Sequence, residues 1–92
     1  MQGKRIAVDL DETLCHGKFW EGEPIPIPEM IDRVWKWYKD GATILIYTAR
    51  QPRYYFETLA WLIKHDVPFH GIAMPIKPSA DYYIDSRQQP DI

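Results

Sequence analysis

The stretch that decides the fold is Arg5-Ile6-Ala7-Val8-Asp9-Leu10-Asp11-Glu12-Thr13, in which a short apolar run ends in two carboxylates. An apolar run of this length is typical of a strand buried on both faces, as in a parallel sheet. We therefore expect a buried strand over residues 5–10. The carboxylates of Asp9 and Asp11 would then lie at and just beyond its carboxyl end.

Further apolar runs alternate with amphipathic segments along the rest of the chain. The expected strands cover residues 42–47, 71–74 and 82–85, and the expected helices cover residues 28–40 and 52–65. Pro28 and Pro52 suit the first turns of the helices, and Asp40-Gly41 is a typical helix stop. This alternation predicts a three-layer, Rossmann-like α/β domain, with a short parallel sheet flanked by helices and joined by right-handed crossovers.

Length and composition limit the possibilities. A chain of 92 residues is enough for a single domain, which we expect to span residues 1–92. Residues 14–28, rich in proline and glycine, are expected to form a flap loop. The net charge of −2 gives no support for a nucleic-acid surface. The single cysteine and the lack of any long apolar run favour a cytoplasmic protein without a membrane span.

Polar side chains gather where the expected strands end. They are Asp9 and Asp11 after the first strand, Thr48 and Arg50 after the second, and Asp85 at the end of the last, with Lys77 in the loop before it. Because ligands of parallel sheets bind beyond the carboxyl ends of the strands, we expect these groups to share one site. Several carboxylates in one place call for a cation, and oxygen ligands suit Mg²⁺. Lys77, Thr48 and backbone N–H groups are suited to hold a phosphoryl group.

These residues resemble the motifs of the haloacid dehalogenase-like (HAD) superfamily. Asp9-Leu10-Asp11-Glu12-Thr13 is similar to its Asp-x-Asp-x-Thr signature, and the strand ending at Thr48 is similar to its second motif. Lys77 resembles the lysine of the third motif, and Tyr83-Ile84-Asp85 resembles the acidic fourth motif. The resemblance covers nearly the whole chain, from Ile6 to Asp85.

The resemblance implies a small capless phosphatase, a phosphoric monoester hydrolase that acts through an aspartyl-phosphate intermediate. Asp9 would be the nucleophile and Asp11 the general acid and base. Thr48 and Lys77 would complete the catalytic set, Lys77 also orienting Asp9. Mg²⁺ would be held by Asp9, by Asp85 and by Asp11, the last through its backbone carbonyl. In the fourth motif, Ser86 stands where the family usually carries a second acid, and Asp81 and Asp91 are the nearest alternatives.

Several other side chains are candidate substrate contacts. They are Thr13, His16, Trp20, Ala49 and Arg50. For Arg50 a structural ion pair is the more common role, and His16 and Trp20 suit plain surface and flap packing. Tyr54 and Trp61 are seven residues apart on the second expected helix. An exposed aromatic pair of this kind would be a surface for homo-oligomer formation.

We expect a phosphorylated small molecule as the substrate, from the classes of nucleotides, sugar phosphates or nucleic-acid ends. One alternative is a regulatory module that binds Mg²⁺ and phosphate with little or no turnover. A receiver-like signalling domain also uses Asp, Thr and Lys around Mg²⁺. In such a domain an acid follows the third strand, and Ala73-Met74 supplies none here.

Overall fold

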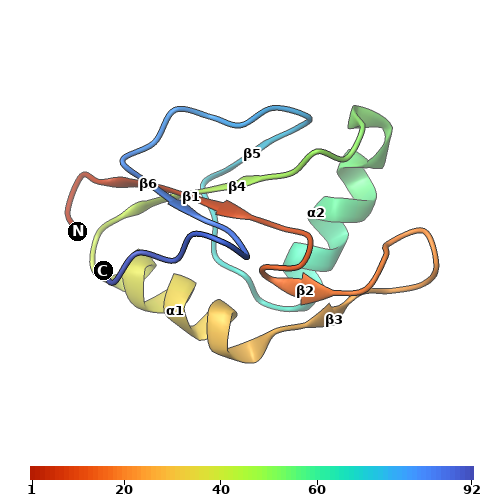
Figure 1. Ribbon diagram of the computed structural model, residues 1–92, viewed down its shortest axis with the longest axis horizontal. Coiled ribbons are helices and arrows are strands. Elements are labelled where there is room, and N and C mark those ends of the chain that lie inside the picture. Colours follow the sequence, from red (N-terminus) through yellow and green to blue (C-terminus); the bar gives the residue numbers. More distant parts are fainter.

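The computed structural model describes residues 1–92 as an α/β domain built on a four-stranded sheet (Figure 1). Its strands are β1 (Arg5–Asp9), β4 (Thr43–Tyr47), β5 (Gly71–Ala73) and β6 (Tyr82–Ile84). They lie in the order β5-β4-β1-β6, and every neighbouring pair is parallel. The expected buried parallel sheet is therefore confirmed, each strand ending within one residue of its expected boundary.

Two helices connect the strands. Helix α1 (Pro28–Lys39) begins at a proline and ends before Gly41, whose φ of 92° continues the chain in the left-handed region that glycine adopts freely. A 3-10 turn, η1 (Pro52–Tyr54), leads into α2 (Tyr55–Lys64). Both expected helices are thus present, the second with a tighter first turn.

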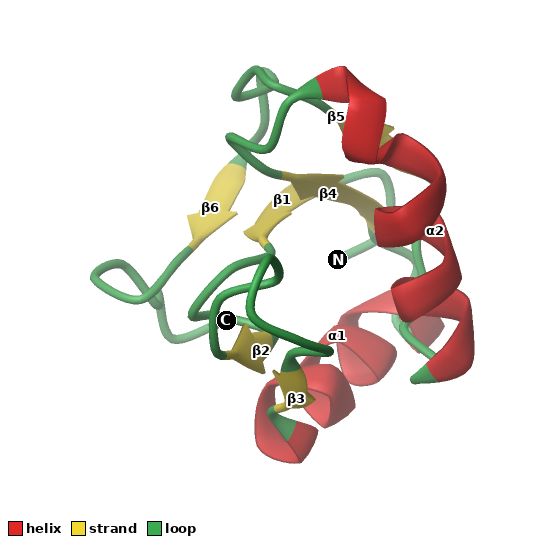
Figure 2. Cartoon of the chain, turned by 90° about the vertical axis from the view of Figure 1, so that its right-hand side faces the viewer, coloured by secondary structure: helices red, strands yellow, loops and turns green.

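The expected three-layer arrangement is wrong, because both helices cover the same face of the sheet (Figures 1 and 2). From β1 through β4 to β5 the chain moves in one direction across the sheet, so two right-handed crossovers place α1 and α2 on one side. The return from β5 to β6 crosses the opposite face, but residues 74–81 form no helix. The domain therefore has two layers of secondary structure.

The core lies between the sheet and the two helices. Alternate strand residues such as Ile6, Val8 and Ile44 are fully buried there, as the two-residue repeat of a strand requires. Helix α1 contributes its expected apolar face. The helical core residues are Met30, Ile31, Val34, Trp37, Trp61 and Leu62. These contacts hold the sheet against the two helices and so fix the positions of the strand ends.

The expected flap is a small antiparallel hairpin, β2 (Cys15–His16) and β3 (Ile25–Pro26). Its base is tied to α2 by the indole of Trp61, which donates to the Pro24 carbonyl at 2.9 Å. Glu23 accepts from Lys64 at 2.9 Å and lies 3.2 Å from a ring nitrogen of His65. These contacts lower the pKa of Glu23, the hydrogen bond from Lys64 having the largest effect. The flap is therefore anchored at its base.

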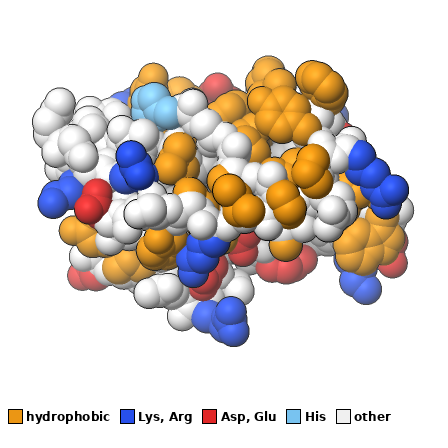
Figure 3. Space-filling model, turned by 90° about the horizontal axis from the view of Figure 1, so that it is seen from above, with side chains coloured by type: hydrophobic (Ala, Val, Ile, Leu, Met, Phe, Trp, Pro, Cys, Tyr) orange, Lys and Arg blue, Asp and Glu red, His pale blue; other side chains and the backbone are white.

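The second face of the sheet lacks a helix. Tyr47 and Tyr83 pack edge to face there, with ring centroids 6.4 Å apart, below the segment 74–81. Hydrophobic side chains gather on this side of the molecule (Figure 3), and Ile76 on the crossing segment is 63 % exposed. Neither α1 nor α2 has the length and apolar character that crossing a lipid bilayer requires.

Candidate active site at the carboxyl edge of the sheet

The expected site residues converge at one edge of the sheet. Asp9 is the last residue of β1 and is in register with Tyr47, the last residue of β4. Thr48 and Asp85 directly follow β4 and β6. Since all the strands are parallel, their carboxyl ends bring these groups together.

Asp9 lies in a partly buried, negatively charged environment. Its pKa is raised from 3.8 to about 6, mainly by burial and in addition by the neighbouring carboxylates of Asp11 and Asp85. The backbone N–H of Leu10, which donates to Oδ1 at 2.9 Å, and the charge of Lys77 act in the opposite direction. Burial, followed by the negative charges of Asp9 and Asp85, raises the pKa of the neighbouring Tyr47 to about 12. The edge therefore favours a bound cation.

Asp85 is held by its own loop. Its Oδ1 accepts the backbone N–H groups of Arg87 at 2.8 Å and of Gln88 at 2.7 Å. In Asp9 and in Asp85 alike, the hydrogen bonds within the protein use Oδ1 and leave Oδ2 without a partner. Two carboxylates thus each present one free oxygen.

This donor set fits Mg²⁺, a hard cation that prefers oxygen ligands. No group of three or more His, Cys, Asp or Glu side chains is arranged to hold a metal ion. The expected set does not require one, because it consists of the carboxylates of Asp9 and Asp85 and the backbone carbonyl of Asp11. The side chain of Asp11 is directed elsewhere.

Asp11 forms a bidentate ion pair with Arg50. The Nε of Arg50 donates to Oδ2 at 3.1 Å and its Nη2 donates to Oδ1 at 2.8 Å. The third donor, Nη1, reaches the hydroxyl of Thr58 on α2 at 3.0 Å. The guanidinium is almost fully buried, and its carbon lies 4.1 Å from the ring centroid of Phe19. Arg50 therefore has the structural ion pair that its sequence position allowed, and it positions the expected general acid.

Thr48 completes this arrangement. Its hydroxyl donates to Asp11 Oδ2 at 3.3 Å and accepts the backbone N–H of Arg50 at 3.1 Å. The residue itself is buried, and its own N–H donates to the Ala73 carbonyl. Thr48 thus links the ends of β4 and β5 to Asp11.

Lys77 is close to the acids but makes no ion pair or hydrogen bond with Asp9. Its ammonium lies 4.5 Å from the ring centroid of Tyr83 and 5.8 Å from that of Tyr47. From there its charge lowers the pKa of Asp9. The expected orientation of Asp9 by a direct Lys77 contact is therefore absent, and an exposed ammonium remains beside the nucleophile candidate.

The remaining candidate contacts are dispersed. His16 is exposed and lies 3.4 Å from Glu12, whereas Trp20 is 67 % exposed at the tip of the flap. Ala49 is exposed beside Thr48. Thr13 is buried, and its hydroxyl has no hydrogen-bond partner. Of the five candidate substrate contacts, only Arg50 touches another expected site residue through its side chain.

The prediction that Tyr54 and Trp61 form an exposed aromatic pair is wrong. Trp61 is only 6 % exposed, because its indole packs under the flap and bonds to Pro24. Tyr54 packs against Phe19, with ring centroids 4.8 Å apart. The sequence did not reveal that the flap folds back over this face of α2, so the proposed oligomer surface does not exist as such.

The two alternatives for a second acid in the fourth motif lie away from Asp85. Asp81 accepts the backbone N–H of Arg5 at 2.8 Å, at the opposite end of β1. The tail that carries Asp91 packs on α1, where the Trp37 indole donates to the Ile92 carbonyl and Arg33 donates to Gln89. Ser86, exposed and next to Asp85, is the residue at the position in question.

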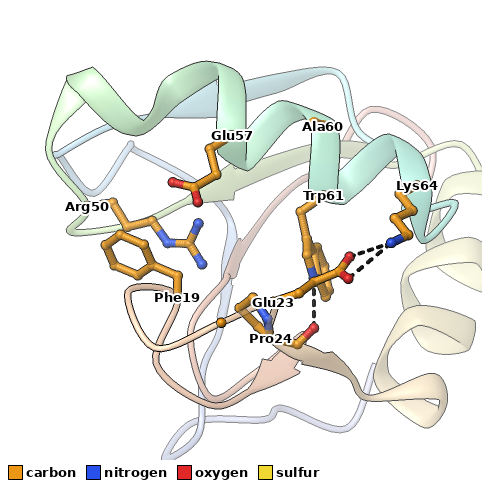
Figure 4. Close-up of a pocket in the computed structure, with 9 residues that line it drawn as sticks. Phe19, Glu23, Pro24, Arg50, Glu57, Ala60, Trp61 and Lys64 are labelled. Carbon is orange, nitrogen blue, oxygen red and sulfur yellow. Dashed lines mark hydrogen bonds and ion pairs between the residues drawn. The ribbon is translucent and has the colours of Figure 1, made fainter.

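A groove of about 330 Å³ opens between the flap and α2, beside Arg50 (Figure 4). Sequence reasoning named Arg50, but it did not reveal that Phe19 on the flap and Glu57 on α2 line one groove with it. No motif marks these positions, since they become neighbours only when the flap docks on the helix. Cys15, at the base of the flap, is buried, and burial raises the pKa of its thiol to about 11, which disfavours a nucleophilic role.

Comparison with known proteins finds no matching family model, no matching curated protein and no matching solved structure. The parallel sheet and the cluster of acids at its carboxyl edge therefore define an α/β domain with a candidate anion- and cation-binding site. Any assignment of activity depends on the chemistry of that site.

Proposed function

We propose that this protein is a Mg²⁺-dependent phosphomonoester hydrolase of the HAD-like type, with Asp9 as its nucleophile. The observation that carries the proposal is the pair of carboxylates, Asp9 and Asp11, held at one strand end in different environments. Asp9 has a free oxygen in a crowded anionic edge, whereas both oxygens of Asp11 are hydrogen-bonded. Two carboxyl groups kept apart in this way suit two chemical roles.

In the proposed reaction, an oxygen of Asp9 attacks phosphorus. The bond between phosphorus and the alcohol oxygen breaks, and the departing oxygen takes a proton from Asp11. Water then attacks the phosphorus of the aspartyl-phosphate, giving its proton to Asp11 and releasing phosphate. Lys77 and the N–H groups of the loop after Asp9 would hold the phosphoryl oxygens.

Mg²⁺, when held by Asp9, Asp85 and the Asp11 carbonyl, would offset the negative charge of the carboxylates and of the phosphoryl oxygens. The ion pair with Arg50 suits Asp11 as the base that activates water. Giving a proton to the leaving oxygen requires the Asp11 carboxyl to turn from Arg50 toward the substrate. The hydroxyl of Thr48, only 3.3 Å from Asp11, would be freed by the same movement to donate to the phosphoryl group.

The test is Mg²⁺-dependent release of phosphate from para-nitrophenyl phosphate. Asp9→Asn should abolish release, while Asp32→Asn, the same change on the exposed side of α1, should keep it. Acid quenching during turnover should trap a phosphoprotein that hydroxylamine cleaves, as expected of an acyl phosphate. Equal release by wild type and Asp9→Asn would refute the assignment.

A regulatory module that binds Mg²⁺ and phosphate is the second candidate. Two observations favour it, namely Ser86 beside the expected metal ligand and the tight ion pair on Asp11. If the protein is such a module, calorimetry should show that it binds Mg²⁺ and inorganic phosphate, and it should release no phosphate from any tested monoester.

A further inference from the structure

The groove between the flap and α2 is a built cavity with a defined chemistry. It is lined by Phe19, Gly22, Glu23, Pro24, Arg50, Glu57, Ala60, Trp61 and Lys64. Its volume, about 330 Å³, lies at the small end of the range for small-molecule sites. Because Phe19 and Trp61 supply aromatic surface, the groove suits a single ring or a short chain and is too small for a polymer.

Most charged side chains that line the groove have an ion-pair partner, but one does not. Arg50 is neutralised by Asp11, and Lys64 is neutralised by Glu23 at 2.9 Å. Glu57 makes no hydrogen bond or ion pair, and its carboxylate extends from α2 toward the end of the cavity where Arg50 and Phe19 lie (Figure 4). As long as Asp11 is paired with Arg50, the groove therefore carries one carboxylate without a partner, that of Glu57.

The groove also adjoins the candidate general acid. Arg50 forms part of its wall and donates to both oxygens of Asp11. In the proposed reaction the leaving oxygen must lie next to Asp11. The carbon skeleton attached to that oxygen would then extend past Arg50 and along the groove.

We propose that this groove receives the alcohol part of the substrate, and that Glu57 selects small phosphomonoesters carrying an ammonium group. The proposal rests on the proposed phosphatase function and narrows its substrate class. The aromatic walls pack against the carbon skeleton, and the Glu57 carboxylate accepts charge-assisted hydrogen bonds from the ammonium. A substrate with a second phosphate would place an anion against Glu57 and is disfavoured.

Two probes that differ in one group test this. Glucosamine 6-phosphate carries an ammonium where glucose 6-phosphate carries a hydroxyl. We expect the wild type to prefer the amine by about tenfold in kcat/KM, the ratio that 1.4 kcal/mol gives. Glu57→Gln should bring the ratio close to one. Glu21→Gln, the same change on the flap outside the groove, should leave the ratio unchanged.

Binding measurements distinguish the proposed role of Glu57 from the proposed phosphatase activity. Calorimetry on Asp9→Asn, with and without Glu57→Gln, should show the same preference for the amine without any turnover. If phosphate is released from neither probe but this preference is found, the phosphatase assignment fails and the groove assignment stands. A wild-type ratio of one or below, or a ratio that survives Glu57→Gln, overturns the role of Glu57.

Discussion

Arg50 holds Asp11 with two parallel hydrogen bonds, 3.1 Å from Nε to Oδ2 and 2.8 Å from Nη2 to Oδ1. Through Nη1 the same guanidinium reaches Thr58 on α2, and one of its faces covers Phe19 of the flap. One buried side chain thus connects a strand end, a helix and the flap around the candidate general acid.

A substitution of Arg50 tests the importance of this bidentate ion pair. Arg50→Lys keeps the charge but cannot make two parallel bonds to one carboxylate. We expect a loss of at least about tenfold in phosphate release, together with a loss of about 2 kcal/mol in the free energy of unfolding, since a buried pair is weakened. Both are measured on one preparation, by phosphate assay and by urea denaturation. Arg53→Lys, an exposed change on η1, is the control, and an unaltered Arg50→Lys protein would contradict the positioning role.

The pKa of Asp9 predicts an unusual dependence of stability on pH in metal-free protein. Its folded-state pKa of about 6 is above the ordinary 3.8, so the native state binds more protons than the unfolded chain between these values. The associated stability is full below pH 3.8 and is lost as the pH rises through 6. Discounted for solvent screening, the difference is about 1–2 kcal/mol.

Asp9→Asn should therefore stabilise the metal-free protein at pH 7.5 and have no such effect at pH 3.5. Thermal unfolding in EDTA at both pH values measures this. Added Mg²⁺ should stabilise the wild type at pH 7.5 but not the variant. A destabilised Asp9→Asn protein at pH 7.5 would show that the carboxylate is not under electrostatic strain.

Lys77 is expected to act on Asp9 through its charge. Since that charge lowers the pKa of Asp9, Lys77→Gln should move the acidic limb of the pH profile of kcat/KM to higher pH. Loss of a cation beside the phosphoryl group should also reduce kcat by about 100-fold. Lys18→Gln removes an exposed lysine that lies over Trp20 and is the matched control. If kcat/KM falls equally at every pH and the acidic limb does not move, Lys77 does not act on the pKa of Asp9.

Ser86 offers a gain-of-function test. Ser86→Asp places a second carboxylate beside Asp85, where it would support the metal or its waters. We expect the Mg²⁺ concentration for half-maximal activity to fall about tenfold, the size of effect that supporting groups have on metal affinity. Ser79→Asp, an exposed change on the loop before β6, should have no effect. An unchanged Mg²⁺ requirement in Ser86→Asp would place the metal away from this loop.

The sequence predicted the strands, the helices and the meeting of the acids because those features depend on local pattern. Apolar runs mark the strands and helices, and proline or glycine residues mark where they begin and end. Parallel pairing of the strands then brings Asp9, Thr48 and Asp85 to one edge of the sheet. The roles proposed for these side chains come from the family resemblance.

What the sequence did not reveal depends on long-range packing. The expected three-layer arrangement failed because the strand order β5-β4-β1-β6 places both crossovers, and with them α1 and α2, on one side of the sheet. Trp61 looked exposed because its partner, the Pro24 carbonyl, is 37 residues away. The groove with Glu57 exists only because the flap folds back on α2.

The central position of β1 also shapes how the chain reaches its native state. Ile6 pairs with Ile44 on one side and with Tyr82 on the other, so its two neighbours are far apart along the chain. Until Tyr82–Ile84 has docked, β1 offers a bare row of N–H and C=O groups, the template on which polypeptides aggregate. Before β6 is synthesised this edge of β1 has no partner, so we expect a chaperone to have its greatest effect on the yield of folded protein during that interval.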